Sequence, residues 1–340
     1  MARGYATDAR QSLFYITPEA TAGTYVAPSV GTTRAIRLTA QPSWSVGGTP
    51  KVTREDTIQS LPGGAPPVLG ARFRSVSFEC FLTEWDNTTD IDGDGQDSHE
   101  LAAFLLACPV TITAGGDVDS PVTIKPAARG DATVSVTWAE ENGDVHRIKG
   151  GRCTFTLSAD ESMLWKLQGT VTGLYIAVED TATFSPSLNF ATPNYTAQPI
   201  VRADNVLFNE SIAGSQSLEG VRSAAFDPSI VVSERSDMTA NENGYTLPFA
   251  THQGQATISL TCDALDEDDL AVFGDAEANN GNLFALTAKM ANGDARLEVS
   301  LADAYLDFPD VGESGGMRTY DLVLRGVPSA GFDAYTISFY

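Results

Sequence analysis

The sequence is poor in basic residues and lacks the long apolar runs that mark membrane-spanning segments. It has 21 Lys and Arg against 44 Asp and Glu, a formal net charge of −23 over 340 residues. Such a chain has no basic footprint for a nucleic acid, and its surface repels anionic membranes. It contains no run of about 18 apolar residues and no apolar segment typical of a signal peptide. We therefore expect a soluble protein without a cleaved leader.

Residues for catalysis are also few. The three histidines lie far apart, and the four cysteines show no CxxC spacing. Cys80 and Cys262 occupy equivalent inward positions of two expected strands, which predicts buried free thiols. There is no nucleophile elbow, no glycine-rich phosphate loop and no HExxH motif. Carboxylate pairs are inevitable among so many acidic residues, so we expect neither an enzyme nor an organic cofactor.

One acidic segment has the spacing of a calcium loop. Asp90, Asp92 and Asp94 alternate and are followed by Gly95, as in D-x-D-x-D-G. Carboxylates at this spacing can converge on a hard cation, and the glycine permits the sharp turn. The twelfth position, where the loop needs a bidentate glutamate, is Leu101. The segment is therefore either a local calcium site or an acidic surface turn.

The chain contains an internal repeat, in which three blocks recur in the same order. The matched pairs are Val76–Ile258, Phe78–Leu260 and Cys80–Cys262, each 182 positions apart; Glu100–Asp269, Leu101–Leu270, Ala102–Ala271 and Phe104–Phe273, each 169 apart; and Asn142–Asn292, Gly143–Gly293 and Asp144–Asp294, each 150 apart. A repeat of this kind indicates a duplicated structural unit, and two copies suggest a pseudo-symmetric assembly subunit.

Apolar and polar residues alternate through most of both copies, which predicts half-buried antiparallel strands. The expected strands are Ser75–Leu82, Thr133–Trp138, Cys153–Leu157, Trp165–Val178, Ala256–Cys262, Leu283–Ala288, Arg296–Ala302, Tyr320–Leu324 and Ala334–Phe339. The ENGD and ANGD segments predict tight hairpins, because Asn-Gly accepts the positive φ angles of a type I′ turn. The sequence thus predicts a mainly β protein of two tandem β-sandwich or barrel domains.

Each domain is expected to carry one short flanking helix. Ser98 or Asp97 would cap the first, which stops before Pro109, and acidic Asp266–Asp269 would open the second. We assign residues 1–35 to an N-terminal arm, 36–190 to domain 1 and 191–340 to domain 2. Domain 1 has polar insertions near 86–98 and 110–130, which are expected on the surface.

Two long loops, Ser45–Gly70 and Val232–Gly254, precede the first matched strand of each copy. Loops of this length inside a compact domain are usually functional or disordered. Their Gly, Pro and polar content predicts an arm that becomes ordered only against a neighbouring subunit, or else a floppy loop.

The N-terminal arm reads TPEATAGTYVAPSVGTTRAIRL, with Glu19 followed by small residues up to Pro28. This segment, together with sheet-rich repeats, flanking helices and acidic charge, resembles phage tail tube proteins. The doubled domain is similar to the subclass in long-tailed, non-contractile phages that carries two tube domains in one chain. The alternatives are an exported or surface β-sandwich module, a capsid decoration protein, or another tail part such as a terminator or adaptor.

The resemblance implies that three chains close a pseudo-hexameric ring and that rings stack around a lumen. The long loops would pack between layers, and the stacking residues would include Gly48, Pro50, Arg54, Glu55, Arg235, Asp237 and Asn243. Partners would be further copies and the tail terminator, tape measure and distal tail proteins, in a virion tail assembled in the bacterial cytoplasm. DNA would pass along a negatively charged lumen without specific binding, and no membrane is involved.

Overall fold

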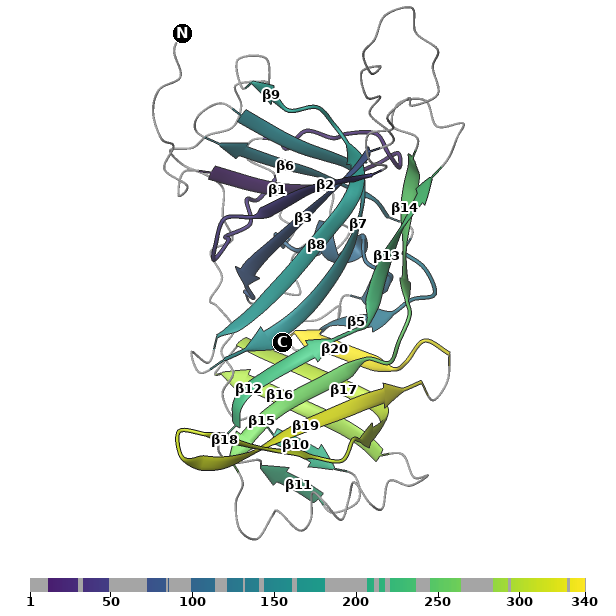
Figure 1. Ribbon diagram of the computed structural model, residues 1–340. Helices are drawn as coiled ribbons and strands as arrows, with labels where there is room; N and C mark the ends of the chain where they lie inside the picture. Colours follow the sequence, from purple (N-terminus) through teal and green to yellow (C-terminus); the bar gives the residue numbers. More distant parts are fainter. Residues whose placement is uncertain are drawn as a thin grey trace, which may run out of the picture.

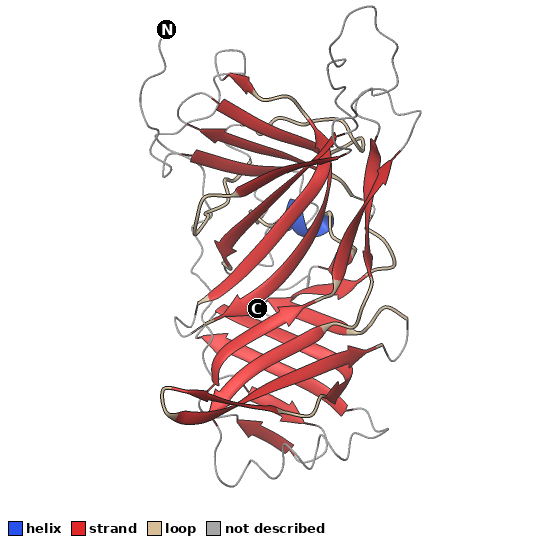
Figure 2. Cartoon of the chain, viewed as in Figure 1, coloured by secondary structure: helices blue, strands red, loops and turns tan. Residues whose placement is uncertain are grey.

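The computed structural model describes residues 12–29, 33–48, 72–83, 85, 99–113, 121–130, 132–140, 144–160, 164–180, 207–210, 214–217, 221–236, 245–263, 284–292, 295–328 and 331–339. These residues form a mainly β protein, and every strand pairing among them is antiparallel. Figure 1 shows the first half of the chain, in purple and teal, stacked on most of the second half, in green and yellow; one green hairpin of the second half, at 230–252, lies beside the first half. Strands dominate in Figure 2, which shows α1 as the single described helix.

Six strands of the first half pair in the order β1-β6-β7-β8-β3-β2, which we call row one. Their bounds are β1 Ser12–Pro18, β2 Ser43–Gly48, β3 Arg72–Phe81, β6 Val134–Glu140, β7 Asp144–Ala159 and β8 Trp165–Tyr175. Around them lie α1 Ala102–Leu106, β4 Val110–Thr113, β5 Val122–Pro126 and β9 Glu179–Asp180.

Six strands of the second half pair in the order β10-β16-β17-β19-β15-β12, which we call row two. Their bounds are β10 Leu207–Glu210, β12 Val221–Asp227, β15 Thr257–Asp263, β16 Phe284–Asn292, β17 Ala295–Leu306 and β19 Met317–Val327. The others are β11 Gly214–Ser217, β13 Ile230–Ser236, β14 Tyr245–His252, β18 Asp310–Ser314 and β20 Tyr335–Phe339.

The two rows have the same strand order, position by position. The first matched block lies on the equivalent strands β3 and β15. Of the third block, Asp144 begins β7 and Asn292 ends β16, which belong to corresponding strand pairs of the two rows. A β-bulge also falls at the same place in both hairpins, between Val134 and Val136 in one and between Phe284 and Leu286 in the other. The two rows therefore share both their strand order and the position of this bulge.

The two rows join into one continuous sheet at a seam between β7 and β12. Leu157, Ser158 and Ala159 at the end of β7 pair with Phe226, Ala225 and Ala224 of β12. A second link is formed where β5 pairs with β20, with Ile124 opposite Ile337. The described pairings do not close either row into a barrel.

The strand predictions are confirmed, because a strand covers most or all of each expected segment, with ends shifted by a few residues. Cys80, Cys108, Cys153 and Cys262 are all buried free cysteines, as expected for Cys80 and Cys262. Burial raises the pKa of the Cys80 thiol well above its ordinary value, so this thiol stays protonated and inert. The second expected helix and the domain break lie outside the described residues, and the domain bounds stay a prediction.

Three expectations about the first half were wrong. The N-cap of α1 is Leu101, without a side-chain hydrogen bond, in place of Ser98 or Asp97. The arm at 1–35 contains β1, a row-one strand in which Leu13 to Ile16 are buried because apolar residues point to both faces. The insertion at 110–130 is not merely superficial, since Val122 and Ile124 of β5 are buried and packed into the core.

Candidate assembly surfaces

One face of the continuous sheet is lined mainly by hydroxyl side chains, and we call it the hydroxyl face. On row one, neighbouring strands place Ser43, Ser77, Thr170 and Thr154 side by side in register. Across the seam the register continues through Ser158, Ala225 and Ser259. The opposite face of the same strands carries the core, including Val76, Phe78, Ile258 and Leu260. The period-two alternation therefore places the polar side chains on one solvent-facing side, the hydroxyl face, which runs from one row to the other.

Hydroxyl groups on this face bond to one another across strands. Ser75 and Thr172 are linked by a hydrogen bond of 2.9 Å, as are Ser77 and Thr170. Cross-strand hydroxyl pairs contribute modestly to sheet stability. They also leave a surface that is polar but weakly charged.

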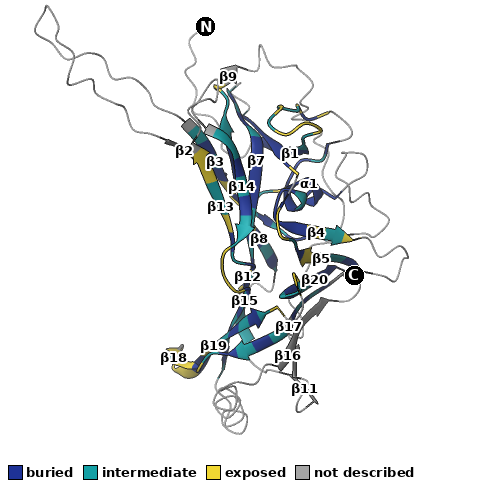
Figure 3. Cartoon of the chain, turned by 90° about the vertical axis from the view of Figure 1, so that its right-hand side faces the viewer, coloured by how far each residue is buried: buried dark blue, intermediate teal, exposed yellow. Residues whose placement is uncertain are grey.

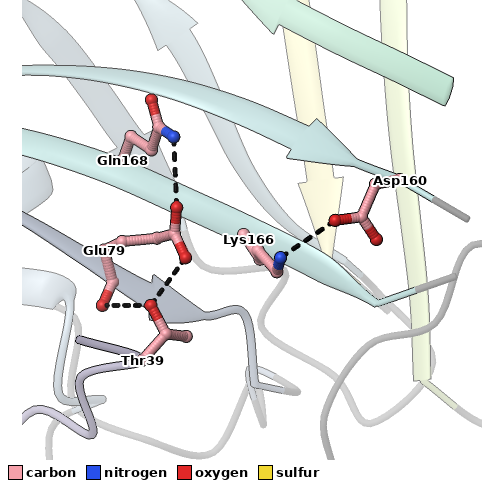
Figure 4. A network of polar contacts seen from close by, with 5 residues as sticks. All are labelled: Thr39, Glu79, Asp160, Lys166 and Gln168. Carbon is pink, nitrogen blue, oxygen red and sulfur yellow. Dashed lines mark hydrogen bonds and ion pairs between the residues drawn. The ribbon is translucent and has the colours of Figure 1, made fainter. Parts of the chain in front are cut away.

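Ion pairs neutralise three of the cations at this face. Lys166 Nζ lies 3.0 Å from Asp160 Oδ2 (Figure 4). The other two pairs are Arg222 with Asp263 and Arg325 with Asp307, each at 2.7 Å.

Three further carboxylates of the hydroxyl face accept hydrogen bonds from uncharged groups. Glu79 accepts from Thr39 Oγ1 at 2.6 Å and from Gln168 Nε2 at 3.1 Å (Figure 4). These hydrogen bonds, with Thr39 contributing most, lower the pKa of Glu79 and keep it ionised. Asp321 accepts from Thr261, and Asp227 accepts from the Ser229 backbone N–H. The described part of the face is therefore net negative.

A shallow groove of about 480 Å³ indents this face beside the seam. Its lining includes Ser77, Glu79, Thr170 and Thr156 of row one, with Asp227 from β12. The groove brings together hydroxyls and carboxylates but no histidine or cysteine. It has the polarity of a wet surface and offers no nucleophile–base pair to a substrate.

Glu19 fixes the chain that follows β1 to the body of row one. Its carboxylate accepts four hydrogen bonds: from Gly23 N at 2.7 Å, Thr133 Oγ1 at 2.8 Å, Ser135 Oγ at 2.7 Å and Gly150 N at 2.7 Å. Gly23 and Gly150 both have positive φ, at 80° and 62°, which favours glycine at these turns. The glutamate within the TPEATAGTYVAP segment is therefore a structural anchor of the arm.

The hairpin β13–β14 packs against row one of its own chain. It lies along β7 and β8 in Figure 1, and its Ala250 is fully buried. Leu247 fills the space beside Gly23 and Gly150, where an added Cβ at Gly150 would come within 2.3 Å of it. We expected the Val232–Gly254 loop to fold only against a neighbouring subunit. Its described part instead packs within the chain, because alternating apolar residues give it one buried face.

His252 at the end of β14 connects the two halves through backbone carbonyls. Its Nε2 lies 2.9 Å from Pro109 O of the first half, and its Nδ1 lies 3.0 Å from Pro228 O of the second half. The ring also contacts Tyr335 of β20 edge-to-face, at 5.9 Å between centroids. This histidine was not recognised from the sequence, because its partners are main-chain atoms distant along the chain.

A buried aromatic and cationic cluster lies beneath the end of β2. Trp44 stacks on Trp138 at 5.5 Å, and the Arg74 guanidinium lies 4.4 Å from the Trp44 ring. Arg74 Nη2 is 2.9 Å from His146 Nδ1, so it donates to an unprotonated nitrogen. Burial, followed by the nearby Arg74 charge, lowers the pKa of His146, which agrees with a neutral ring.

Most of the expected site residues lie outside the described part of the chain. These are Asp90, Asp92 and Asp94 of the possible calcium loop and Pro50, Arg54, Glu55, Asp237 and Asn243 of the stacking loops. Gly48 ends β2, and Arg235 lies on β13 with its side chain exposed. No group of three or more His, Cys, Asp or Glu within the described ranges could hold a metal ion. Calcium binding and ring stacking stay predictions.

No described helix is long and apolar enough to cross a membrane. Comparison with protein-family models and with curated proteins finds no match for this sequence.

Proposed function

We propose that the chain is a structural subunit of a bacteriophage tail tube, and that three copies close a pseudo-hexameric ring that stacks into a tube. The observation that carries the proposal is the seam: two units with the same strand order join edge to edge within one chain. A unit whose edges complement each other in this head-to-tail manner can repeat, because heterologous contacts generate rings or filaments. Pairing the edges also removes exposed strands that would otherwise aggregate.

The hydroxyl face supports a lumen-lining role. Its described part is polar, continuous across the seam and net negative, and three of its cations are held in ion pairs. A wall with unpaired Lys or Arg would bind phosphates and slow the passage of DNA, whereas a weakly negative wall repels them. In this proposal the buried cores of both rows form the tube wall, and Glu19 holds the N-terminal arm for contacts between rings.

Electron microscopy of the purified protein in negative stain tests the proposal. Rings or tubes with a central hole, built from three chains per ring, are the expected result. Rings of six chains, or contacts only between like rows, would contradict the head-to-tail arrangement. Discrete monomers at all concentrations would favour a decoration or surface module.

The lumen assignment has its own test. Glu79→Lys, Asp227→Lys and Asp321→Lys combined should leave tubes intact but bind DNA to them at low salt and lower infectivity through delayed ejection. The matched control combines Glu79→Gln, Asp227→Asn and Asp321→Asn, which removes the charges without adding cations. If the lysine variant behaves like this control, the hydroxyl face does not line the DNA path.

A further inference from the structure

Two strand edges lack a partner although their counterparts in the other half are paired. Among the described strands, β2 pairs only with β3, and β18 pairs only with β19. By strand order, β12 is the counterpart of β2. By pairing register, β18, which pairs with β19, takes the place that the end of β7 has beside β8. These counterparts pair with each other and form the seam. Each chain therefore contains one seam and the two unmatched halves of another.

The register of the missing seam follows from the pairs that are present. Trp44 of β2 lies opposite Val76, and Phe226 of β12 lies opposite Ile258, which is the match of Val76. Trp44 is therefore equivalent to Phe226. By the same reasoning Ser43, opposite Ser77, is equivalent to Ala225, opposite Ser259.

The other edge is placed in the same way. Leu157 pairs with Leu167, which in turn lies opposite Cys80. In row two, Cys262 lies opposite Tyr320, and Tyr320 pairs with Val311 of β18. Val311 is therefore equivalent to Leu157, and Gly312 is equivalent to Ser158.

Exposure differs sharply between the paired and unpaired edges. In the seam, Leu157 is 2% and Phe226 1% exposed. At the free edges, Val311, the equivalent of Leu157, is 53% exposed, and Figure 3 shows β18 largely exposed at the outer side of the second half. Trp44, the equivalent of Phe226, is partly buried against the core of its own chain, whereas Val46, two residues further along β2, is 53% exposed. Apolar side chains at open strand edges indicate a surface that is covered in the assembled state.

We propose that β18 of one copy pairs antiparallel with β2 of the next, with Val311 opposite Trp44 and Gly312 opposite Ser43. The occupant of each edge is a second copy of this chain, because the same pairing already exists inside the chain between β7 and β12. The turn at Gly315 and Gly316, with φ of 62° and 81°, forms the two-residue hairpin that carries β18. The inference rests on the head-to-tail assembly proposed above and adds its contact and register.

Cysteine cross-linking tests the register. The four native cysteines are buried, so an introduced thiol reports its own neighbour. A mixture of Ser43→Cys and Gly312→Cys chains should form a disulfide between copies under mild oxidation. The matched control replaces Ser43→Cys with Ser45→Cys, two residues along the same exposed face of β2. It should cross-link about tenfold more slowly, because residues two positions out of register exceed the span of a disulfide.

Each outcome separates the contact from the function. Rings or tubes without the 43–312 cross-link, or with equal cross-linking at 45, would overturn the proposed contact and leave the tube subunit proposal standing. Absence of any assembly, together with absence of the cross-link, would overturn both.

A second pair of variants covers the case in which Gly312→Cys folds poorly, since its Cβ would lie 2.9 Å from Thr319 Oγ1. Val311→Asp should raise the concentration needed for assembly at least about tenfold, because a carboxylate would be buried opposite Trp44. Phe332→Asp, at a residue 58% exposed in the β19–β20 connection, is the control and should assemble like the original chain. Equal behaviour of the two variants would overturn the contact.

Discussion

Replacing Glu19 by glutamine tests whether the N-terminal segment is anchored as the structure shows. The carboxylate accepts four hydrogen bonds, two of them from backbone N–H groups of Gly23 and Gly150. Its other donors, Thr133 and Ser135, are each 1% exposed, so water cannot replace a lost partner. Glutamine offers a single acceptor oxygen. Its NH₂ group can donate to one hydroxyl but faces one backbone N–H, so a bond to a charged group is lost and a backbone donor is left unsatisfied, at about 1.5 kcal/mol each. The free energy of unfolding should therefore fall by about 3 kcal/mol.

Urea unfolding, followed by tryptophan fluorescence, measures this change. With a slope of about 3 kcal/mol per M, the midpoint should fall by about 1 M. Glu79→Gln is the matched control, since its carboxylate is solvent-facing and should cost about 0.5 kcal/mol at most. If Glu19→Gln shifts the midpoint no more than this control, the anchor does not carry the stability assigned to it.

Four further predictions concern separate parts of the molecule. Leu157→Ala should cost about 3 kcal/mol by thermal unfolding, because a seam side chain is buried, whereas Val311→Ala should stay within about 0.5 kcal/mol in the monomer; equal losses would contradict the difference between the edges. The pKa of His146 is lowered in the folded protein, so the unfolded chain binds a proton first as pH falls, and the free energy of unfolding should decrease below about pH 6.5. His146→Gln should remove this decrease, and a pH profile of stability that the substitution leaves unchanged would contradict the prediction. His252→Leu should lower the free energy of unfolding, measured with urea, by about 2 kcal/mol, because the ring no longer contacts the Pro109 and Pro228 carbonyls and at least one of them loses its hydrogen-bond donor. An unchanged free energy of unfolding would show that the two halves do not depend on this ring. Asp92→Ala should lower Tm only when calcium is present. A calorimetric titration that shows no heat at millimolar calcium would favour the alternative, an acidic surface turn that binds no ion.

Much of the fold follows from local alternation. From Ser75 to Cys80 in β3, and throughout β15, polar and apolar residues alternate, so both strands, their buried faces and their polar faces could be predicted. The burial of Cys80 and Cys262 followed from the same alternation. β1 was missed because its apolar residues point to both faces, which leaves no period of two. β5 was missed because a four-residue alternation stood between glycine, aspartate and proline residues that favour turns.

The candidate surfaces were predictable only in part. Hydroxyl residues on single strands pointed to a wet face, but the seam depends on which edges meet, and no local pattern specifies that. The anchor at Glu19 and the contacts of His252 join residues more than 100 positions apart. Sequence matching also aligned the hairpin tips at Asn142 and Asn292, whereas the strand register shows that the second hairpin is longer. The equivalent strand edges could therefore be identified only from the strand pairing in the structure, and not from the sequence alone.

In the ring proposed above, fusing two units in one chain changes how the ring closes. Six separate units would need six contacts between molecules, each costing translational and rotational freedom. In a two-unit chain half of the contacts are intramolecular, and the β7–β12 seam already forms at the effective concentration set by the linker. Only three contacts then depend on protein concentration, so each exposed edge can be weak in isolation and still close a ring. An exposed edge with few apolar residues, such as β18 with Val311, is what this arrangement requires: weak enough to leave free subunits soluble, and repeated around a ring to hold it.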